Sequence, residues 1–501
     1  MGLAEIRSRT GVVGLDEVLS GGLLPYRLYL VDGDPGAGKT TLALQFLLEG
    51  LRGGERCMYV TLSESKPELE AGAASHGWSL DGIEILELLS EADMFDDAEQ
   101  LTVLTESEVE LSTTTRRILN AVEQYAPQRV VLDSLSDLRL LAQNSLRYRR
   151  QVVALKQFFL GRRCTVMMLD DRTMQGPDVQ LHSIAHGVVA LNSSTPAYGQ
   201  TRRDLCVVKF RGSDFISGRH DFVIRGGGLT VFPRLIAADH TTITERGRLE
   251  SGVAQLDALL GGGVDRGTST LLVGPPGSGK STIAMQYAVT AVSRGEHAAV
   301  FAFDETQAAM LARSRSIGLH IALGRGAGEL DYHQVDPVVM SPGEFADIIR
   351  RCVEHDHARI IVIDSLNGYL NSMHHSNYLT AQLHELLTYL NNQGVATFIV
   401  VAQSGMVGAN MAAPVEASYL ADSVLLLRYF EHAGSVKKAI SVLKKRTGGH
   451  EGSIRQLWFD ARGIHLSEPL LELHGVLTGV PTEAARTERI QPLDPPSHAH
   501  E

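Results

Sequence analysis

The sequence has little cysteine, no excess of basic charge and no long apolar run, and each shortage excludes a class of protein. Its 4 cysteines form no C-x-x-C pair and are scattered over the chain as Cys57, Cys164, Cys206 and Cys352. This pattern favours buried free thiols in a reducing cytoplasm over a disulfide scaffold. The net charge of −12 opposes a protein whose main task is to coat nucleic acid, although it permits a local basic channel.

Targeting and membrane signals are also missing from the sequence. The first seven residues, Met-Gly-Leu-Ala-Glu-Ile-Arg, lack the apolar core of a signal peptide. No run approaches the roughly 20 apolar residues that a membrane span needs. We therefore expect a cytoplasmic protein that does not enter a membrane.

What the sequence does have is enough ordinary globular chain for several domains. It contains 501 residues, of which 44% are hydrophobic and 21% charged, as in typical soluble proteins. The last residues are polar and rich in proline, including Pro492, Pro495 and Pro496, and we expect this tail to be disordered.

One short stretch occurs twice and organises the chain. The first copy is Gly33, Asp34, Pro35, Gly36, Ala37, Gly38, Lys39 and Thr40. The second copy is Gly274, Pro275, Pro276, Gly277, Ser278, Gly279, Lys280 and Ser281. Both match a glycine, four residues and then Gly-Lys-Ser/Thr, which is the phosphate-binding loop of nucleotide-binding proteins. A chance glycine-rich turn explains one copy poorly and two copies hardly at all.

The flanking residues give both loops the context that the motif requires. Apolar strands precede them, and helix-like runs follow that begin with Thr41 and Thr282. The glycines allow backbone N–H groups to surround phosphate oxygens, and the helix N-terminus adds partial positive charge. Lys39 and Lys280 are expected to reach the β- and γ-phosphates of ATP, and Thr40 and Ser281 to bind Mg²⁺.

The spacing of later landmarks indicates a duplicated domain. The two loop lysines are 241 residues apart, and Asp133 and Asp364 are 231 residues apart. A period this long excludes a solenoid and matches one α/β domain of roughly 230 to 240 residues. The apolar rhythm lapses near 232–248, which we interpret as a linker. The expected domains are 1–235 and 236–475, followed by a C-terminal segment, 476–501.

Within each copy, β-branched runs alternate with helical segments. The runs expected to form buried strands include 57–62, 130–133 and 165–169 in the first copy and 298–303, 360–364 and 397–402 in the second. This alternation predicts an α/β fold with a mostly parallel sheet covered by helices on both faces. Ligands of such sheets bind at the carboxyl ends of the strands.

Several carboxylates follow predicted strands. Asp133 and Asp364 end strands in the manner of a Walker B aspartate, which positions Mg²⁺ or its water. Alone, either one could equally cap a turn, but the upstream phosphate loops favour the metal role. Asp304 and Glu305 follow the second strand of the second copy, where a carboxylate can act as a base. In the first copy Ser63 takes the first of these positions and leaves Glu64; helix N-capping is the alternative for all of them.

A Lys-x-Arg pair ends a late strand in each copy. Lys209 and Arg211 form the first pair, and Lys444 and Arg446 form the second, 235 residues later. On a strand, residues two apart point to the same face, so both cations of a pair can reach the γ-phosphate of a neighbouring subunit. A solvated basic edge that discourages strand aggregation is the alternative.

These motifs together resemble the KaiC family, the RecA-like ATPases of the bacterial clock. The resemblance covers nearly all of the chain and includes both loops, the acidic pair, the two Asp-Ser-Leu segments, the two Lys-x-Arg pairs and the segment 475–481. It implies tandem RecA-like domains in a double-ring homohexamer with ATP and Mg²⁺ between subunits. It also implies ATP hydrolysis in the first ring, serine/threonine autophosphorylation in the second, and signalling partners such as KaiB-like proteins.

The phosphorylation site departs from the family pattern. The family modifies an adjacent serine and threonine, and here Ser418 matches the serine whereas Tyr419 replaces the threonine. The matching positions of the first copy are His182 and Ser183. The resemblance therefore implies Ser418 as a phosphoacceptor, and it implies no second acceptor beside it.

Two other functions compete with this interpretation. A DNA recombinase or helicase of the same fold needs basic loops at a central pore. Arg139, Arg147, Arg149 and Arg150 follow Asp133, but the matching stretch 367–392 contains no Lys or Arg. A nucleotide-dependent scaffold with little turnover is the second rival, and Ser63 favours it. We expect no nucleic acid partner.

Overall fold

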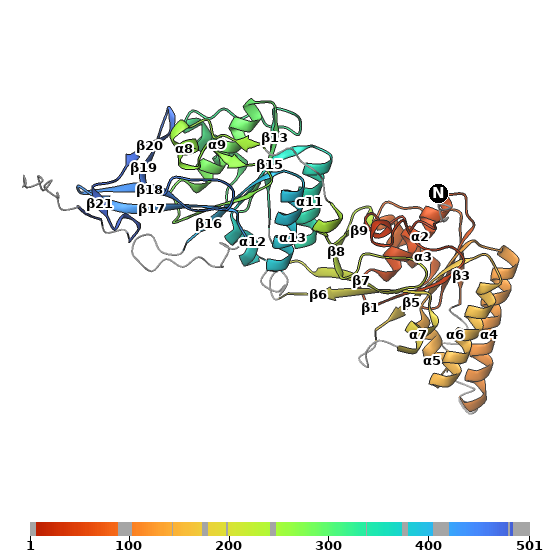
Figure 1. The fold of residues 1–501 in the computed structure, drawn as a ribbon. Coiled ribbons are helices and arrows are strands. Elements are labelled where there is room, and N and C mark those ends of the chain that lie inside the picture. Colours follow the sequence, from red (N-terminus) through yellow and green to blue (C-terminus); the bar gives the residue numbers. More distant parts are fainter. Residues whose placement is uncertain are drawn as a thin grey trace, which may run out of the picture. The chain divides into compact units, whose positions relative to one another are not determined.

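The computed structural model divides the chain into two compact units. It describes residues 7–88, 103–142, 144–172, 179–196, 199–240, 247–336, 338–372, 379–403, 420–478 and 481–483. One unit comprises residues 1–235 with 338–347, and the other comprises residues 236–337 with 348–501. Each repeat of the sequence contributes one nine-stranded sheet, and helices lie on its faces (Figure 1).

The sheet of the first repeat places its parallel strands in the order β3-β2-β4-β5-β1-β6 and then adds the antiparallel strands β7-β8-β9. The strand bounds are β1 (Leu28–Gly33), β2 (Cys57–Thr61), β3 (Ile83–Glu87), β4 (Arg129–Asp133), β5 (Thr165–Asp171), β6 (Gly187–Ser194), β7 (Arg202–Phe210), β8 (Arg219–Arg225) and β9 (Gly228–Phe232). Residues in β1, β2 and β4 are buried throughout, because helices cover both faces of the sheet.

Two hydrophobic clusters hold these helices to the sheet. On one face lie α1 (Leu15–Val18), α2 (Lys39–Arg52) and α3 (Lys66–Ser75). The helices on the other face are α4 (Val103–Tyr125), α5 (Leu135–Ala142), α6 (Ser145–Leu160) and α7 (Val179–Ile184). The sheet is thus the middle layer of three.

The second repeat has the same topology. Its strands are ordered β14-β13-β15-β16-β12-β17, all parallel, followed by the antiparallel β18-β19-β20. The bounds are β12 (Ser269–Gly274), β13 (His297–Ala302), β14 (Leu330–Gln334), β15 (Ala358–Asp364), β16 (Ala396–Ala402), β17 (Ser423–His432), β18 (Ser435–Lys445), β19 (Arg455–Asp460) and β20 (Gly463–Pro469). The identical order confirms the duplication.

The remaining elements are helices and short pieces. The helices are α8 (Ala254–Leu259), α9 (Lys280–Ser293), α10 (Gln307–Ser316), α11 (Pro342–Glu354), α12 (Leu366–Ser372) and α13 (Leu379–Asn392). The short pieces are η1 (Ala237–Asp239), β10 (Arg248–Leu249), β11 (Val264–Asp265), β21 (Leu473–His474), η3 (Val476–Thr478) and β22 (Thr482–Glu483). Helices α8, α9 and α10 share one core cluster, whereas α12 and α13 pack on β16.

The structure confirms the predicted fold class and refines its details. Two nine-stranded, mostly parallel sheets with helices on both faces match the expected tandem RecA-like domains. The helices after the phosphate loops begin at Lys39 and Lys280, two residues before the predicted runs, because Gly38 and Gly279 cap them in the left-handed conformation. The antiparallel strands β8 and β9 and the edge strand β3 were not predicted. Across the described helices, none combines the length and apolar character that crossing a bilayer requires.

Candidate functional site

The first phosphate loop joins the buried strand β1 to helix α2. Gly36 and Gly38 both have positive φ, 74° and 104°, a region that side chains rarely adopt. At Gly38 a Cβ atom would lie 2.5 Å from Cδ1 of Ile224. Glycine is therefore required at this position by both conformation and space.

Lys39 folds back over its own loop. Its ammonium donates to the carbonyl oxygens of Gly33 and Asp34, at 3.0 Å each. It also forms an ion pair with Asp171, at 2.6 Å from Nζ to Oδ1. The side chain of Lys39 is nearly buried, so its charge is held by these three oxygens at the place where phosphate oxygens bind in such loops.

A hydroxyl and a carboxylate meet beside this lysine. Thr40 Oγ1 donates to Asp133 Oδ2 at 3.2 Å, and the hydroxyl of Tyr59 donates to the same oxygen at 2.5 Å. Burial raises the pKa of Asp133, although both hydrogen bonds and the nearby Lys39 oppose the shift. The predicted metal-binding pair, Thr40 and Asp133, is thus in direct contact.

The second loop has the same construction. Gly277 and Gly279 have φ of 75° and 110°, and a Cβ atom on Gly279 would collide with the ring of Phe459. Lys280 donates to the carbonyl of Pro275 at 2.8 Å. Burial lowers the pKa of Lys280 to about 8, against the opposing effect of Asp364, so a nearby anion would stabilise its charged form.

Ser281 and Asp364 repeat the pairing of Thr40 with Asp133. The Ser281 hydroxyl is hydrogen-bonded to Asp364, which lowers the pKa of that carboxyl, but burial dominates and raises it. Beside them, the hydroxyl of Ser278 is fully buried and has no hydrogen-bond partner among the described residues. A donor left unsatisfied in this loop is suited to a phosphate oxygen.

The two acidic candidates of the second repeat have different surroundings. Asp304 Oδ2 accepts a hydrogen bond from Ser365 Oγ at 3.1 Å, next to Asp364. Glu305 instead forms a two-point ion pair with Arg313 of α10, at 3.0 and 2.7 Å. Arg313 also donates to Thr282 Oγ1 at 3.3 Å. Glu305 is therefore fixed by an arginine, whereas the partner of Asp304 among the described residues is a neutral hydroxyl.

The corresponding turn of the first repeat carries Ser63 and Glu64. Thr61 Oγ1 donates to the Glu64 carbonyl at 2.7 Å and accepts from the Glu64 N–H at 2.9 Å, which fixes the turn. Ser65 and Glu68 then form a capping box at the start of α3. Burial raises the pKa of Glu64, and the negative charges of Asp133 and Glu68 add to the shift.

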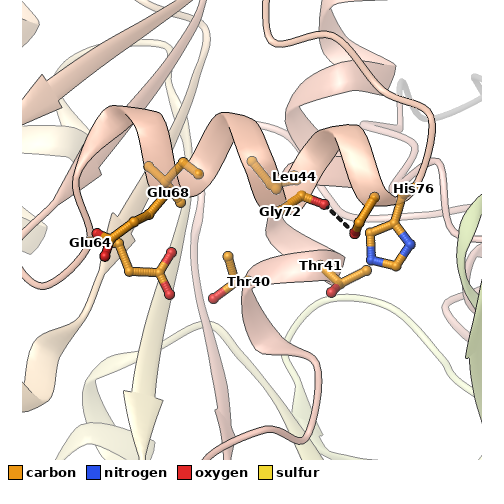
Figure 2. A pocket seen from close by; sticks show the side chains of 9 residues that line it. Thr40, Thr41, Leu44, Glu64, Glu68, Gly72 and His76 are labelled. Atoms are coloured by element: carbon orange, nitrogen blue, oxygen red, sulfur yellow. Dashed lines mark hydrogen bonds between the residues drawn. The ribbon is translucent and has the colours of Figure 1, made fainter.

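A cavity lies beside the first loop, between the start of α2 and the side of α3 (Figure 2). It has a volume of about 320 Å³. Its lining comprises Thr40, Thr41, Leu44, Glu64, Glu68, Leu69, Gly72, Ser75 and His76. Gly72 lies seven residues after the N-cap residue of α3, and Arg313 lies at the same position of α10 in the second repeat. The glycine leaves space in the first repeat that an arginine occupies in the second. The two sites therefore differ in shape as well as in charge.

The lysines of the Lys-x-Arg pairs are bound within their own repeat. Lys209 donates to the carbonyls of His182 and Ala185 at 2.6 and 2.7 Å. Lys444 donates to the carbonyl of Ala421 at 2.7 Å. Arg446 lies 3.3 Å from Asp422 and remains half exposed, and the side chain of Arg211 is exposed.

Strand register places both pairs far from the phosphate loop of their own repeat. Phe210 of β7 lies opposite Gly187, which lies beside Tyr29 near the start of β1. The loop begins at Gly33, four residues further on, or about 13 Å at the usual rise of a strand. The second repeat has the same arrangement, since Lys444 pairs with Val424 beside Leu271. Neither pair can therefore contact a nucleotide on its own loop.

Three functional candidates escaped sequence reasoning. Asp171 and Tyr59 contact Lys39 and Asp133 in the first repeat, and Arg313 contacts Glu305 in the second. Only Asp171 carried a usable signal, because it lies two residues after the end of the predicted strand 165–169. Ser418 and Tyr419 lie outside the described residues, while His182, which matches Ser418 in the first repeat, contacts Asp32 at 2.9 Å.

A comparison with protein families shows the family to which the chain belongs. The family model described as "ATPase: KaiC" matches residues 8–236 and 249–470. The chain belongs to the KaiC ATPase family. Membership supports ATP binding and ATPase activity of the kind found in this family.

Curated relatives of this KaiC family member match along nearly the whole chain. The circadian clock protein KaiC3 of Synechocystis is 26% identical over 487 residues, which cover 96% of this chain and 95% of the relative. The circadian clock oscillator protein KaiC of Picosynechococcus is also 26% identical, over 96% of this chain and 93% of its own. That of Thermosynechococcus vestitus is 27% identical, with the same two coverages.

Replacing the loop lysines tests the two sites separately. Lys39→Ala and Lys280→Ala should each halve the amount of bound ATP, because each removes the buried ammonium of one loop. Equilibrium dialysis with labelled ATP measures this, and Lys66→Ala, an exposed lysine of α3, is the control. Full ATP occupancy in either loop variant would refute the assignment of that loop.

Asp364→Asn should separate stability from activity. Burial raises the pKa of Asp364, so burying its charged form makes folding less favourable. The amide should therefore raise the free energy of unfolding by about 1 kcal/mol in nucleotide-free protein and abolish turnover at the second site. The gain should shrink as the pH falls toward 3.8, the ordinary pKa of an aspartate side chain, because the carboxyl is then protonated. Thermal melts measure it, and Asp460→Asn, at an exposed carboxylate, should give no gain.

Proposed function

We propose that this protein is an ATP-hydrolysing ring with serine autokinase activity in its second repeat, acting as a signalling or clock-type timer. The observation that carries the proposal is the doubled site: two phosphate loops, each with a buried lysine and a hydroxyl–aspartate pair. The predicted domains 1–235 and 236–475, with the segment 476–501, serve as the units of the ring.

Thr40 with Asp133, and Ser281 with Asp364, are the residues that would hold Mg²⁺. Their hydroxyl and carboxylate oxygens are the ligands that this ion prefers. Bound Mg²⁺ supplies charge neutralisation at the β- and γ-phosphates. The unpartnered Ser278 hydroxyl and the loop N–H groups would bind phosphate oxygens, and Lys39 and Lys280 would turn from carbonyl oxygens to the nucleotide.

A closed homohexamer follows from the position of the Lys-x-Arg pairs. Each pair lies at the opposite end of its sheet from its own loop, so it can serve only a nucleotide on another subunit. A ring places every pair at a neighbour's site without leaving one unused. KaiB-like or other signalling proteins are the partners that the family resemblance implies.

In the second repeat, Asp304 is the residue that we assign as the base. It is held by a neutral hydroxyl beside Asp364, whereas Glu305 is neutralised by Arg313. Asp304 would take the proton of the Ser418 hydroxyl as that oxygen attacks the γ-phosphorus and ADP leaves. The side chain of Asp304 is one methylene shorter than the glutamate usual in the family, so its carboxylate would lie farther from the acceptor hydroxyl. A displacement of about 1 Å can slow transfer about a hundredfold.

In the first repeat the same position is Ser63, which cannot act as a carboxylate base. Glu64, with its raised pKa, is the remaining candidate for positioning water. The Lys39–Asp171 ion pair must also open before phosphate can contact Lys39. These features favour the second candidate function, a nucleotide-dependent scaffold with little turnover, for the first repeat alone. The DNA-binding alternative is weakened because Arg139 is paired with Asp170 at 2.7 Å.

Removing the arginines tests the ring. The double variant Arg211→Ala with Arg446→Ala should slow ATP turnover about a hundredfold or more, because an arginine supplied in trans contributes ~10³ to 10⁵ in rate, and it should leave nucleotide binding intact. Light scattering with Mg²⁺·ATP should give a hexamer, and Arg462→Ala is the control. A monomer under these conditions would contradict the proposal.

Phosphate mapping tests the kinase. Incubation with ATP should label Ser418 slowly, and Ser418→Ala and Asp304→Asn should abolish labelling, whereas Tyr419→Phe and Glu305→Gln should retain it. Tyr419 should stay unmodified, because its phenol oxygen lies several ångströms beyond a threonine hydroxyl. Mass spectrometry locates the phosphate. Phosphate within residues 1–235, or labelling that survives Ser418→Ala, would show that the assignment of the second site is wrong.

A further inference from the structure

Three side chains of different ligand type meet beside the edge strand of the second sheet. Asp331 and His333 belong to β14, and Cys352 belongs to α11. Their ligand atoms, Oδ2 or Oδ1, a ring nitrogen and Sγ, all lie within 4.8 Å of one another. This cluster is remote in sequence from both phosphate loops and takes no part in the proposed ATP chemistry.

The cluster is enclosed and held in place. Asp331 and His333 are two residues apart on a strand and therefore point to the same face of the sheet. The His333 ring stacks on Phe301 of the neighbouring strand, with centroids 4.7 Å apart and planes at 5°. The exposed fractions of Asp331 and Cys352 are 9% and 3%. The ligand atoms are thus fixed before anything binds to them.

Both partners of His333 converge on one nitrogen. Asp331 Oδ2 lies 2.8 Å from Nε2, and Cys352 Sγ lies 3.7 Å from the same atom. Nε2 can donate its one proton to Asp331 or accept one from Cys352, but it cannot do both. Asp331 Oδ2, although buried, makes no hydrogen bond of proper geometry among the described residues. Hydrogen bonding alone therefore leaves the cluster unsatisfied.

The first repeat shows what the fold needs at these positions. The ends of β3 and β14 align, and so do the ends of β4 and β15. When residues are counted back from these ends, His333 corresponds to Leu86 and Cys352 corresponds to Ala121. Leu86 and Ala121 pack in the hydrophobic cluster of that repeat. An apolar contact between this strand and its helix is sufficient for folding, so the histidine and cysteine of the second repeat serve another purpose.

A catalytic Cys–His pair is the obvious alternative. Burial raises the pKa of the Cys352 thiol to about 12, so the thiol is protonated and a poor nucleophile. The exposed fraction of 3% also leaves a substrate no access to the sulfur. A small ion does not need such access once the site has formed.

We infer that Asp331, His333 and Cys352 form a zinc site that fastens β14 to α11. One sulfur, one imidazole nitrogen and one carboxylate oxygen are ligands that Zn²⁺ accepts. For tetrahedral Zn²⁺, bonds of about 2.3 Å to sulfur and about 2.0 Å to nitrogen place those two ligands about 3.5 Å apart. The observed separation of 3.7 Å is close to this. The Asp331–His333 contact would have to open slightly.

Charge balance supports a divalent ion. A thiolate and a carboxylate around Zn²⁺ give a neutral site, whereas the metal-free cluster relies on the exposed Arg325, 3.2 Å from Asp331 Oδ2. Cys352 would lose its proton to solvent as zinc binds. Water would take the fourth position, as it does at zinc sites where the protein supplies three ligands.

Metal titration of the full chain, purified without a polyhistidine tag and treated with chelator, tests the site. Zn²⁺ should bind at one equivalent per chain and raise the melting temperature. Co²⁺ should give a thiolate-to-metal charge-transfer band, which an oxygen-only Mg²⁺ site cannot give. The absence of such a band in the wild-type protein would overturn the inference.

Two variants locate the ligand and guard against misfolding. The double variant His333→Leu with Cys352→Ala installs the residues of the first repeat, so it should fold and bind ATP normally. It should no longer bind the one Zn²⁺ per chain, and with Co²⁺ it should show no charge-transfer band. Cys206→Ala, at the more accessible thiol of β7, should keep both. A band that survives the double variant, or that disappears with Cys206→Ala, would show that zinc binds elsewhere.

Discussion

Both halves of the molecule depend on one constraint, a left-handed glycine that joins a buried strand to the first turn of a helix. At Gly38 and Gly279 a side chain would strain the backbone and strike Ile224 or Phe459. Because these contacts come from late segments of each repeat, the antiparallel strands β8 and β19 support the loop that opens the repeat. Without these two strands, the space beside Gly38 and Gly279 would be open, and the packing would no longer require glycine there. The position of the loop is therefore a property of the whole sheet.

The sequence was sufficient for the parts of the fold that repeat along the chain. Runs of β-branched residues predicted the buried strands. Because parallel strands end at the same edge of a sheet, Lys39, Glu64 and Asp133 were expected to lie together at that edge. It was insufficient where a contact joins distant segments. No local pattern reveals that Tyr59 donates to Asp133, because the pairing of β2 with β4 brings these residues together. The edge strand β3 escaped for a related reason, since only one residue of its burial pattern is buried.

Equivalent positions around the two loops have exchanged their chemistry. The first repeat has Tyr59, Ser63 and Asp171, and the register of the two sheets aligns these with Val300, Asp304 and Ala402. The second repeat thus has a carboxylate just after β13, next to the Walker B strand, whereas the first repeat has one at the end of β5, next to the loop. In the first repeat it contacts the loop lysine, whereas in the second it lies beside Ser365.

Under the proposed function, this difference would give the two repeats of one duplicated fold different interactions with nucleotide. A carboxylate paired with the loop lysine competes with the γ-phosphate and so stabilises the nucleotide-free loop. It also weakens the interaction of that lysine with the negative charge that develops on the phosphate during transfer. Tyr59 adds a donor to Asp133 and draws its charge away from a metal ion. In the second repeat, the hydrogen-bond acceptor of Lys280 among the described residues is a backbone carbonyl. Because Lys280 is buried, a bound anion would stabilise its charged form more strongly. Under the proposed function, the first repeat thus stabilises its nucleotide-free loop, whereas the second repeat leaves Lys280 available to the phosphates.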